Sequence, residues 1–155
     1  MASLFRGVHA LNLDAKGRMA MPTRYRERLR DRSNGKLVVT IDTEERCLVA
    51  YPKPEWEDIE RKLDALPTFN RQAVRVKRLL MGHAADVEMD GHGRLLLPPP
   101  LREFAGLDKR LVFVGQGKKF ELWDDAHWTE RREQWLKEET AGFEELPAEL
   151  QSLSL

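Results

Sequence analysis

The chain contains one short pattern twice, and this duplication constrains the fold more than any other feature of the sequence. The first copy is DAKGRMAMP at residues 14–22, followed by YRE at 25–27; the second is DGHGRLLLP at residues 90–98, followed by LRE at 101–103. Asp, Gly, Arg, Pro, Arg and Glu coincide at a constant offset of 76 residues. Because self-similarity at a fixed spacing is typical of repeated structural units, the sequence predicts two copies of one small unit.

Each copy is predicted to begin with a β-hairpin. Residues 8–13 and 18–21 alternate weakly between apolar and polar side chains, as strands do. They are joined by Asp-x-x-Gly, in which Asp at the first position and Gly at the fourth favour a type I turn. Pro22 in the first copy and Pro98 in the second end the next strand, and a short helix follows. A further strand, turn, strand and helix complete the unit.

A single copy has too little apolar surface to fold alone, because it contains only four short strands. Two copies in one chain can interdigitate around a pseudo-twofold axis, as two chains do in a swapped homodimer. We therefore expect an α+β fold in which both copies share one core. The helices that carry Trp56 and Trp128, which follow equivalent strands, are expected to close the ends of that core.

Two helical segments separate the copies. Apolar residues recur at helical spacing from Trp56 to Leu66, and again from Ala73 to Leu80. The predicted organisation is therefore repeat 1 over 8–54, a helical linker over 55–83, repeat 2 over 84–127 and a C-terminal helical tail over 128–155.

The chain is neutral overall, but its charges are segregated. It has 26 basic and 26 acidic residues, a balance that by itself argues against a nucleic-acid-binding domain. Between Lys16 and Lys36, however, eight residues are basic and two are acidic, whereas from Glu121 onward ten are acidic and three are basic. The basic surface is therefore expected on the first copy.

Several classes of protein are excluded. A single cysteine, Cys47, rules out internal disulfides and zinc sites built on two or four thiolates. The four histidines show no spacing of a metal or catalytic site, so no enzymatic activity, cofactor, metal or small-molecule substrate is expected. The glycine-rich segment 115–119 lacks the length and ending of a phosphate loop and is predicted to be a hairpin turn. Without an apolar span or signal segment, the chain is expected to be cytoplasmic, with no membrane partner.

Asp-x-x-x-Arg, followed by apolar-x-apolar-Pro and a further Arg, resembles the signature of SpoVT/AbrB-type swapped-hairpin domains. Its duplication at this spacing resembles the MraZ family of bacterial transcriptional regulators, as do the segments at 5–7, 78–84 and 120–123. The resemblance implies tandem AbrB-like swapped-hairpin β-barrel units related by a pseudo-twofold, with flanking helices. It also implies a nucleoid-associated, ring-like homo-oligomer that binds short direct repeats in double-stranded promoter DNA. The implied target is the division and cell-wall gene cluster, including the protein's own gene.

DNA-binding residues are predicted mainly around the first turn. Lys16 lies at the tip of this turn amid other basic residues, whereas the second turn has His92 at its tip. By resemblance, the DNA-contacting arginine of the family corresponds to Arg18, and Arg94 is the weaker equivalent. The predicted DNA-binding residues are Lys16, Arg18, Arg24, Arg26, Arg6 and Arg94, and the predicted turn-structuring residues are Asp14, Gly17, Asp90 and Gly93. The alternative that both Asp–Arg pairs only stabilise the turns stays open.

Two other classes of function also stay open. Swapped-hairpin domains occur as antitoxins, and apolar residues in the tail from Thr140 to Leu155 could bind a partner protein. A purely structural ring is the second alternative. Neither alternative explains the basic residues of segment 16–36 as well as DNA binding does.

Overall fold

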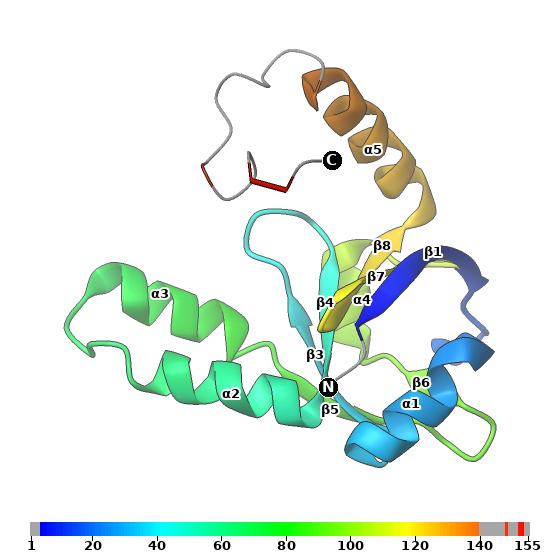
Figure 1. The fold of residues 1–155 in the computed structure, drawn as a ribbon, viewed down its shortest axis with the longest axis horizontal. Coiled ribbons are helices and arrows are strands. Elements are labelled where there is room, and N and C mark those ends of the chain that lie inside the picture. Colours follow the sequence, from blue (N-terminus) through cyan, green and yellow to red (C-terminus); the bar gives the residue numbers. More distant parts are fainter. Residues whose placement is uncertain (1–3, 140–147, 149–151, 154–155) are drawn as a thin grey trace. The chain divides into compact units, whose positions relative to one another are not determined.

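The computed structural model describes residues 4–139, 148 and 152–153 (Figure 1). The chain divides into two compact units, residues 1–125 and 126–155. The strands are β1 (Phe5–Asn12), β2 (Arg18–Ala20), β3 (Lys36–Ile41), β4 (Leu48–Pro52), β5 (Ala85–Glu88), β6 (Arg94–Leu96), β7 (Arg110–Gly117) and β8 (Lys119–Asp124). The helices are α1 (Thr23–Ser33), α2 (Lys53–Asp64), α3 (Arg71–Leu80), α4 (Pro99–Ala105) and α5 (Asp125–Glu139), the last of which leads into the second unit.

Six antiparallel strands form one sheet, in the order β1-β7-β8-β4-β3-β5. The two repeats exchange strands within it. Strand β1 of the first repeat pairs along its whole length with β7 of the second, and β5 of the second repeat pairs with β3 of the first. Each repeat therefore places its first strand in the half of the sheet that the other repeat builds, which explains why one copy could not complete a sheet alone.

The pairing registers follow a pseudo-twofold axis. Between β4 and β8, Val49 lies opposite Glu121, and the neighbouring pairs on either side exchange equivalent positions of the two repeats. Strands β2 and β6 form a separate two-stranded sheet in which Met19 lies opposite Leu95, its own equivalent 76 residues later. The duplication in the sequence is thus a rotational symmetry in the structure.

The two predicted hairpins are wrong in their pairing. The first turn does form, since the Gly17 N–H donates to the Asp14 carbonyl at 3.0 Å. Beyond the turn, however, β1 and β2 share only an isolated bridge between Leu13 and Met19, and β2 pairs with β6 instead. Alternation of apolar residues fixes the face that a strand buries but not its partner, so the adjacent strand was the wrong choice. The turn predicted at 115–119 is confirmed, because β7 and β8 pair up to Gln116 opposite Lys119.

One hydrophobic core joins the two repeats, as expected. The ring of Phe120, from the second repeat, lies 4.3 Å from that of Phe5 and 5.1 Å from that of Tyr25, centroid to centroid. Tyr25 and Leu29, the predicted apolar side of α1, are both fully buried. The expectation of a shared core is confirmed.

Helices α2 and α3 run side by side (Figure 1), and α2 packs on β3 and β4. Trp56 is buried in a second cluster with Val38 and Leu63, against which Val76 and Leu80 pack. In the second unit, Trp128 makes an edge-to-face contact with Trp135 at 5.9 Å. The role of Trp128 in closing the core stays a prediction. No helix among the described residues is long and apolar enough to cross a membrane.

The predicted α+β class is confirmed, and the strand exchange follows a pseudo-twofold. The six-stranded sheet is nevertheless open, with β1 and β5 at its edges, and β2 and β6 form a sheet of their own. The strands of residues 4–139 therefore do not close into the predicted barrel units.

Candidate nucleic-acid interface

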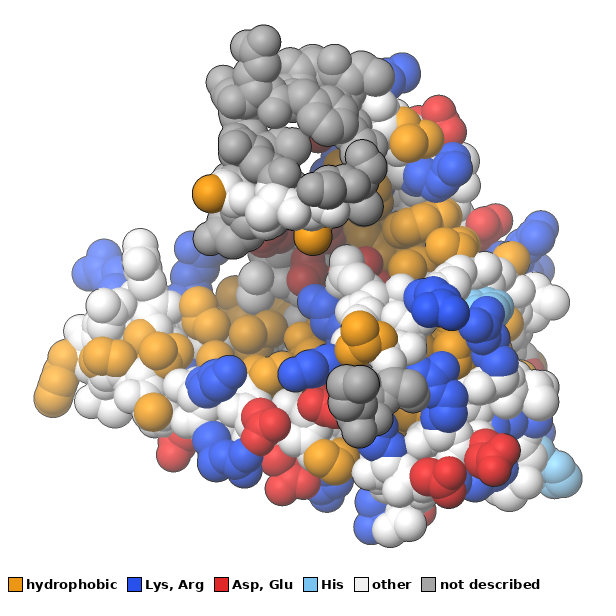
Figure 2. All heavy atoms as spheres, viewed as in Figure 1, with side chains coloured by type: hydrophobic (Ala, Val, Ile, Leu, Met, Phe, Trp, Pro, Cys, Tyr) orange, Lys and Arg blue, Asp and Glu red, His pale blue; other side chains and the backbone are white. Residues whose placement is uncertain are grey.

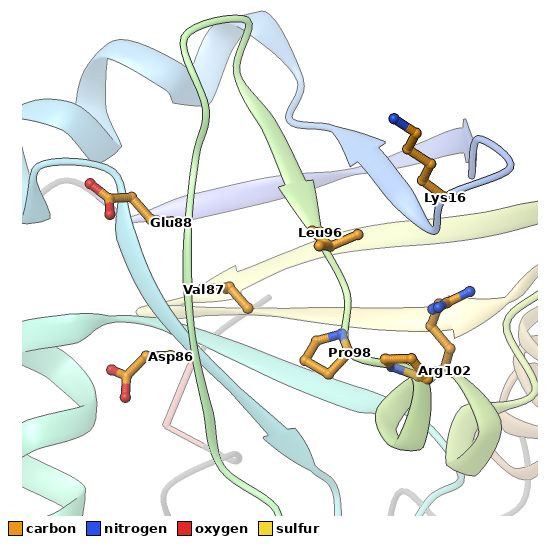
Figure 3. A pocket seen from close by; sticks show the side chains of 8 residues that line it. Lys16, Asp86, Val87, Glu88, Leu96, Pro98 and Arg102 are labelled. Atoms are coloured by element: carbon orange, nitrogen blue, oxygen red, sulfur yellow. The ribbon is translucent and has the colours of Figure 1, made fainter.

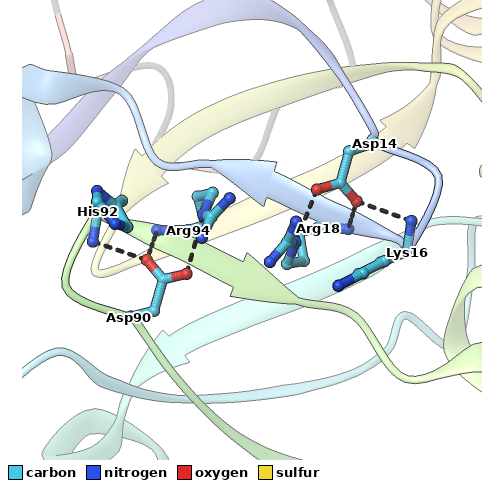
Figure 4. A network of polar contacts seen from close by, with 6 residues as sticks. All are labelled: Asp14, Lys16, Arg18, Asp90, His92 and Arg94. Carbon is cyan, nitrogen blue, oxygen red and sulfur yellow. Dashed lines mark hydrogen bonds and ion pairs between the residues drawn. The ribbon is translucent and has the colours of Figure 1, made fainter.

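The two Asp-x-x-Gly-Arg turns have the same internal structure (Figure 4). In the first, Oδ1 of Asp14 accepts hydrogen bonds from the backbone N–H groups of Lys16 at 3.0 Å and Arg18 at 2.9 Å. The other carboxylate oxygen, Oδ2, accepts one from Nε of Arg18 at 2.7 Å. Asp90 makes the same three contacts in the second turn, each at 2.9 Å. Each aspartate therefore fixes both the backbone of its turn and the direction of its arginine.

These hydrogen bonds lower the pKa of both aspartates. For Asp14, the backbone and side-chain hydrogen bonds from Arg18 hold the pKa below its ordinary value of 3.8. For Asp90, the backbone N–H of Arg94 is the largest cause, and the pKa falls to about 2. Both carboxylates are therefore ionised at neutral pH and stay paired with their arginines.

Strands β2 and β6 form a short exposed ribbon, residues 18–20 and 94–96, which we call the β2–β6 ribbon. Its inner face carries Met19 and Leu95, both fully buried. Its outer face carries two cross-strand pairs, Arg18 with Leu96 and Ala20 with Arg94. Because directly opposite residues and alternate residues of a strand share a face, both arginines project from the same side of the ribbon, at its two ends.

The ion pairs leave the outer ends of both arginines available to a ligand. Each aspartate engages Nε, and among the described residues no hydrogen bond reaches Nη1 or Nη2 of Arg18 or Arg94. The side chains are 27% and 34% exposed. A guanidinium held this way can still donate two parallel hydrogen bonds to a ligand with two adjacent acceptors.

A second pair of arginines braces the turns from behind. Nε of Arg26, on α1, donates to the Met21 carbonyl at 2.7 Å, and its guanidinium lies against Gly93 in the turn of the other repeat. Arg102, on α4, does the same with Leu97 at 3.0 Å and with Gly17. Arg26 was predicted as a DNA contact from its place in the sequence; the structure gives it these intramolecular contacts.

Arg6 and Arg24 belong to a different cluster, around Tyr25. Arg24 is exposed, and its guanidinium lies 5.3 Å from the centre of the Tyr25 ring. The Tyr25 hydroxyl donates to the Arg6 carbonyl and lies 3.0 Å from Nε2 of His9. Burial and the nearby Arg24 charge lower the pKa of His9. The structure therefore brings Lys16, Arg18 and Arg94 together at the ribbon, while Arg6 and Arg24 flank it as a separate group.

Two residues at the ribbon were missed by sequence reasoning. Arg102 matches Arg26 at the offset of 76, so the duplication contained the signal for its role. Leu96 gave no signal, since an apolar residue in a strand is ordinarily buried. It lines a shallow pocket of about 510 Å³ beside Lys16, Pro98 and Arg102 (Figure 3).

The surface around these elements is rich in basic side chains. Figure 2 shows Lys and Arg gathered on the side where α1 lies, with fewer acidic side chains among them. No cluster of His, Cys, Asp or Glu that could hold a metal ion occurs among the described residues. The chemistry available at this site is therefore electrostatic and hydrogen-bonding recognition.

Fold and site together define a class: a pseudo-symmetric α+β protein that presents an arginine-bearing β-ribbon, an element that transcription factors place in DNA grooves. The family model described as "MraZ protein, putative antitoxin-like" matches residues 4–79 and 80–151. The chain is 60% identical to the transcriptional regulator MraZ of Halorhodospira halophila and 58% identical to that of Thioalkalivibrio sulfidiphilus, in each case over 98% of this chain and 100% of the relative. The protein of that name from Coxiella burnetii is 55% identical over the same share.

The chain belongs to the MraZ family, a family of transcriptional regulators and not of enzymes. The resemblance drawn from the two turns is thereby confirmed. The expectation that the chain is not an enzyme agrees with this membership.

Proposed function

We propose that the protein regulates transcription by binding double-stranded DNA through the outer face of the β2–β6 ribbon. The observation that carries this proposal is the pair of aspartate-held arginines on one exposed face, both with free Nη atoms. A two-stranded antiparallel ribbon fits the major groove of B-DNA. The ribbon therefore supports sequence recognition, beyond simple attraction to phosphates.

The arginines suit guanine in particular. Guanine presents O6 and N7 as two adjacent acceptors in the major groove, and an arginine that donates to both is the commonest specific contact. Asp14 and Asp90 engage only Nε, so each arginine meets the base already oriented. Because little side-chain entropy is then lost on binding, the contact is stronger than one from a free arginine.

The surrounding basic residues supply contacts to the phosphate backbone. Lys16 is exposed at the tip of the first turn, and Arg6 and Arg24 are exposed on β1 and α1. Each neutralised phosphate contributes about −0.9 to the slope of log K against log salt, so these few contacts make one subunit a weak, salt-sensitive binder.

Assembly into a ring-like homo-oligomer compensates for the weak binding of one subunit. Several ribbons that engage spaced direct repeats of a promoter raise the avidity by about 10²–10⁴ without any new contact. We assign the division and cell-wall gene cluster as the target, including the protein's own gene, with the protein acting in the cytoplasm at the nucleoid. The family membership and the relatives' name, transcriptional regulator, support this assignment.

The alternative of a protein-interaction module relates to the family description "antitoxin-like". The notebook of sequence features for it lies in the tail, of which residues 140–147, 149–151 and 154–155 are outside the described part of the chain. The ribbon geometry favours DNA.

A selection experiment tests the proposal. Random and genomic DNA fragments are enriched on the purified protein, and the affinity for the enriched site is measured by fluorescence anisotropy for the wild type and for the double variant Arg18→Ala/Arg94→Ala. We expect the double variant to lose binding at unchanged oligomer size by light scattering. Arg71→Ala on α3, which removes one exposed positive charge elsewhere, is the control and should retain binding. Full binding by the double variant would place the DNA site elsewhere.

A further inference from the structure

The two ends of the β2–β6 ribbon are equivalent by symmetry but different in chemistry. At one end, Arg18 has Leu96 directly opposite it; at the other, Arg94 has Ala20. Leu96 and Ala20 are themselves equivalent positions, 76 residues apart. The symmetry of the backbone therefore places a large apolar side chain beside one arginine and a single methyl group beside the other.

Leu96 stands out from its neighbours because it is exposed. Its relative exposure is 56%, whereas Leu95 and Leu97, on either side, are fully buried. Leu96 is not part of either hydrophobic cluster of the first unit. An exposed leucine in the centre of a site otherwise made of charged groups lowers solubility without adding to the core, so a contact with a ligand is the natural explanation.

The position of Leu96 relative to Arg18 matches the spacing of bases. Directly opposite residues of an antiparallel pair have Cβ atoms about 4.5–5.5 Å apart. Neighbouring base pairs of DNA are stacked about 3.4 Å apart. When the Nη atoms of Arg18 lie in the plane of one base pair, the Leu96 side chain is therefore beside the next.

Resting on the proposed DNA-binding function, we infer that Leu96 recognises the C5-methyl group of a thymine adjacent to the guanine contacted by Arg18. In the major groove that methyl group is the apolar feature by which proteins distinguish thymine, and small or branched apolar side chains make the contact. Ala20 is too short to bury such a methyl to the same extent beside Arg94. Leu96 is thus a specificity-determining residue of one end of the ribbon only.

Deoxyuridine provides the direct test, since it pairs like thymine but lacks the C5-methyl group. Each thymine of an enriched site is replaced in turn by deoxyuridine, and the affinities of wild type and Leu96→Ala are measured by anisotropy. Burial of one methyl group predicts about a three- to fivefold loss for the wild type at one or two thymines. Leu96→Ala should bind the unmodified site about as weakly as the wild type binds the modified one, with no further loss on removal of the methyl.

Ala20→Leu is the matched gain-of-function variant. It places a leucine beside Arg94, and we expect a new sensitivity to deoxyuridine next to the base that Arg94 contacts, with the original sensitivity retained. Because both positions are exposed, the two variants should unfold at the wild-type temperature.

The outcomes separate this inference from the function on which it rests. If Leu96→Ala keeps the wild-type sensitivity at every thymine, the inference is wrong although DNA binding stands. A smaller assembly of Leu96→Ala in light scattering would show that the leucine is a subunit contact instead, and would equally overturn the inference. If no DNA site is enriched, or if Arg18→Ala/Arg94→Ala binds as the wild type does, the proposed function itself fails.

Discussion

Arg102 covers Gly17 across the boundary between the two repeats. A Cβ atom on Gly17 would lie 2.5 Å from Cζ of the Arg102 guanidinium. The Gly17 carbonyl also accepts the N–H of Leu97 at 3.0 Å, and the Leu97 carbonyl accepts Nε of Arg102 at 3.0 Å. The first turn is therefore held in place by a strand end and a helix of the other repeat, and the second turn is held in the same way by Arg26.

Replacement of Gly17 by alanine should destabilise the fold. Gly17 has a φ of +85°, in the left-handed region, and the added methyl group would displace the Arg102 guanidinium. We expect the free energy of unfolding to fall by about 1–3 kcal/mol, measured by urea denaturation. Gly91→Ala is the control in the matching turn, because no atom lies within 4 Å of its Cβ position and the equivalent residue is already Ala15. Equal effects of the two substitutions would contradict this explanation.

Arg26→Ala and Arg102→Ala should have similar effects on stability. Each removes one hydrogen bond from a charged donor to a backbone carbonyl, together with the packing over a glycine, so we expect a loss of about 1.5–3 kcal/mol in urea denaturation. Anisotropy with the enriched DNA decides whether Arg26 also contacts DNA. A much larger loss of DNA affinity for Arg26→Ala than for Arg102→Ala would show a direct contact.

Single substitutions at the ribbon should weaken DNA binding without unfolding the protein. Removal of one arginine that contacts guanine costs about 1–3 kcal/mol, so Arg18→Ala should bind the enriched site about 5- to 150-fold more weakly. Asp14→Asn leaves the arginine in place but removes its ionic partner, and should give a smaller loss. Competition binding against sites with a substituted guanine would reveal whether Arg18→Ala relaxes specificity at one base; uniform weakening across all sites would indicate a phosphate contact.

The stability of the second turn should depend on pH in acid. Because the pKa of Asp90 in the folded protein is about 2, below its ordinary value of 3.8, the ionised carboxylate favours the folded state. This contribution is fully present above about pH 4 and is lost as the pH falls toward 2. The urea midpoint of the wild type should therefore exceed that of Asp90→Asn at pH 6, with the difference shrinking between pH 4 and 2. A difference that stays constant over this range would argue against the ion pair.

Cys47 should not react with thiol reagents in the folded protein. Its side chain is fully buried, and burial together with the carboxylates of Glu121, Asp42 and Glu45 raises the pKa of the thiol. Since the thiolate is the reactive form, labelling by a chromogenic disulfide should be slow in buffer and rapid in urea. Rapid labelling of the native protein would show that the strand bearing Cys47 opens locally.

Local structure could be predicted from the sequence because it depends on nearby residues. The Asp-x-x-Gly turns, the prolines that precede α1 and α4, and the apolar side of α1 at Tyr25 and Leu29 were all expected and are confirmed. The duplication further predicted a pseudo-twofold and a core shared between the repeats. These features follow from hydrogen bonds and side-chain spacing within a few residues, or from equality of the two copies.

Only the tertiary structure decided which strands pair and which side chains remain exposed. Strand β1 lies beside β7 rather than β2, because alternation specifies a buried face and leaves the partner open. The bracing of Gly17 by Arg102 and the exposure of Leu96 both depend on the ladder between β2 and β6, whose strands are 76 residues apart. Contacts at that separation are set by packing of the whole core, so no local pattern could reveal them.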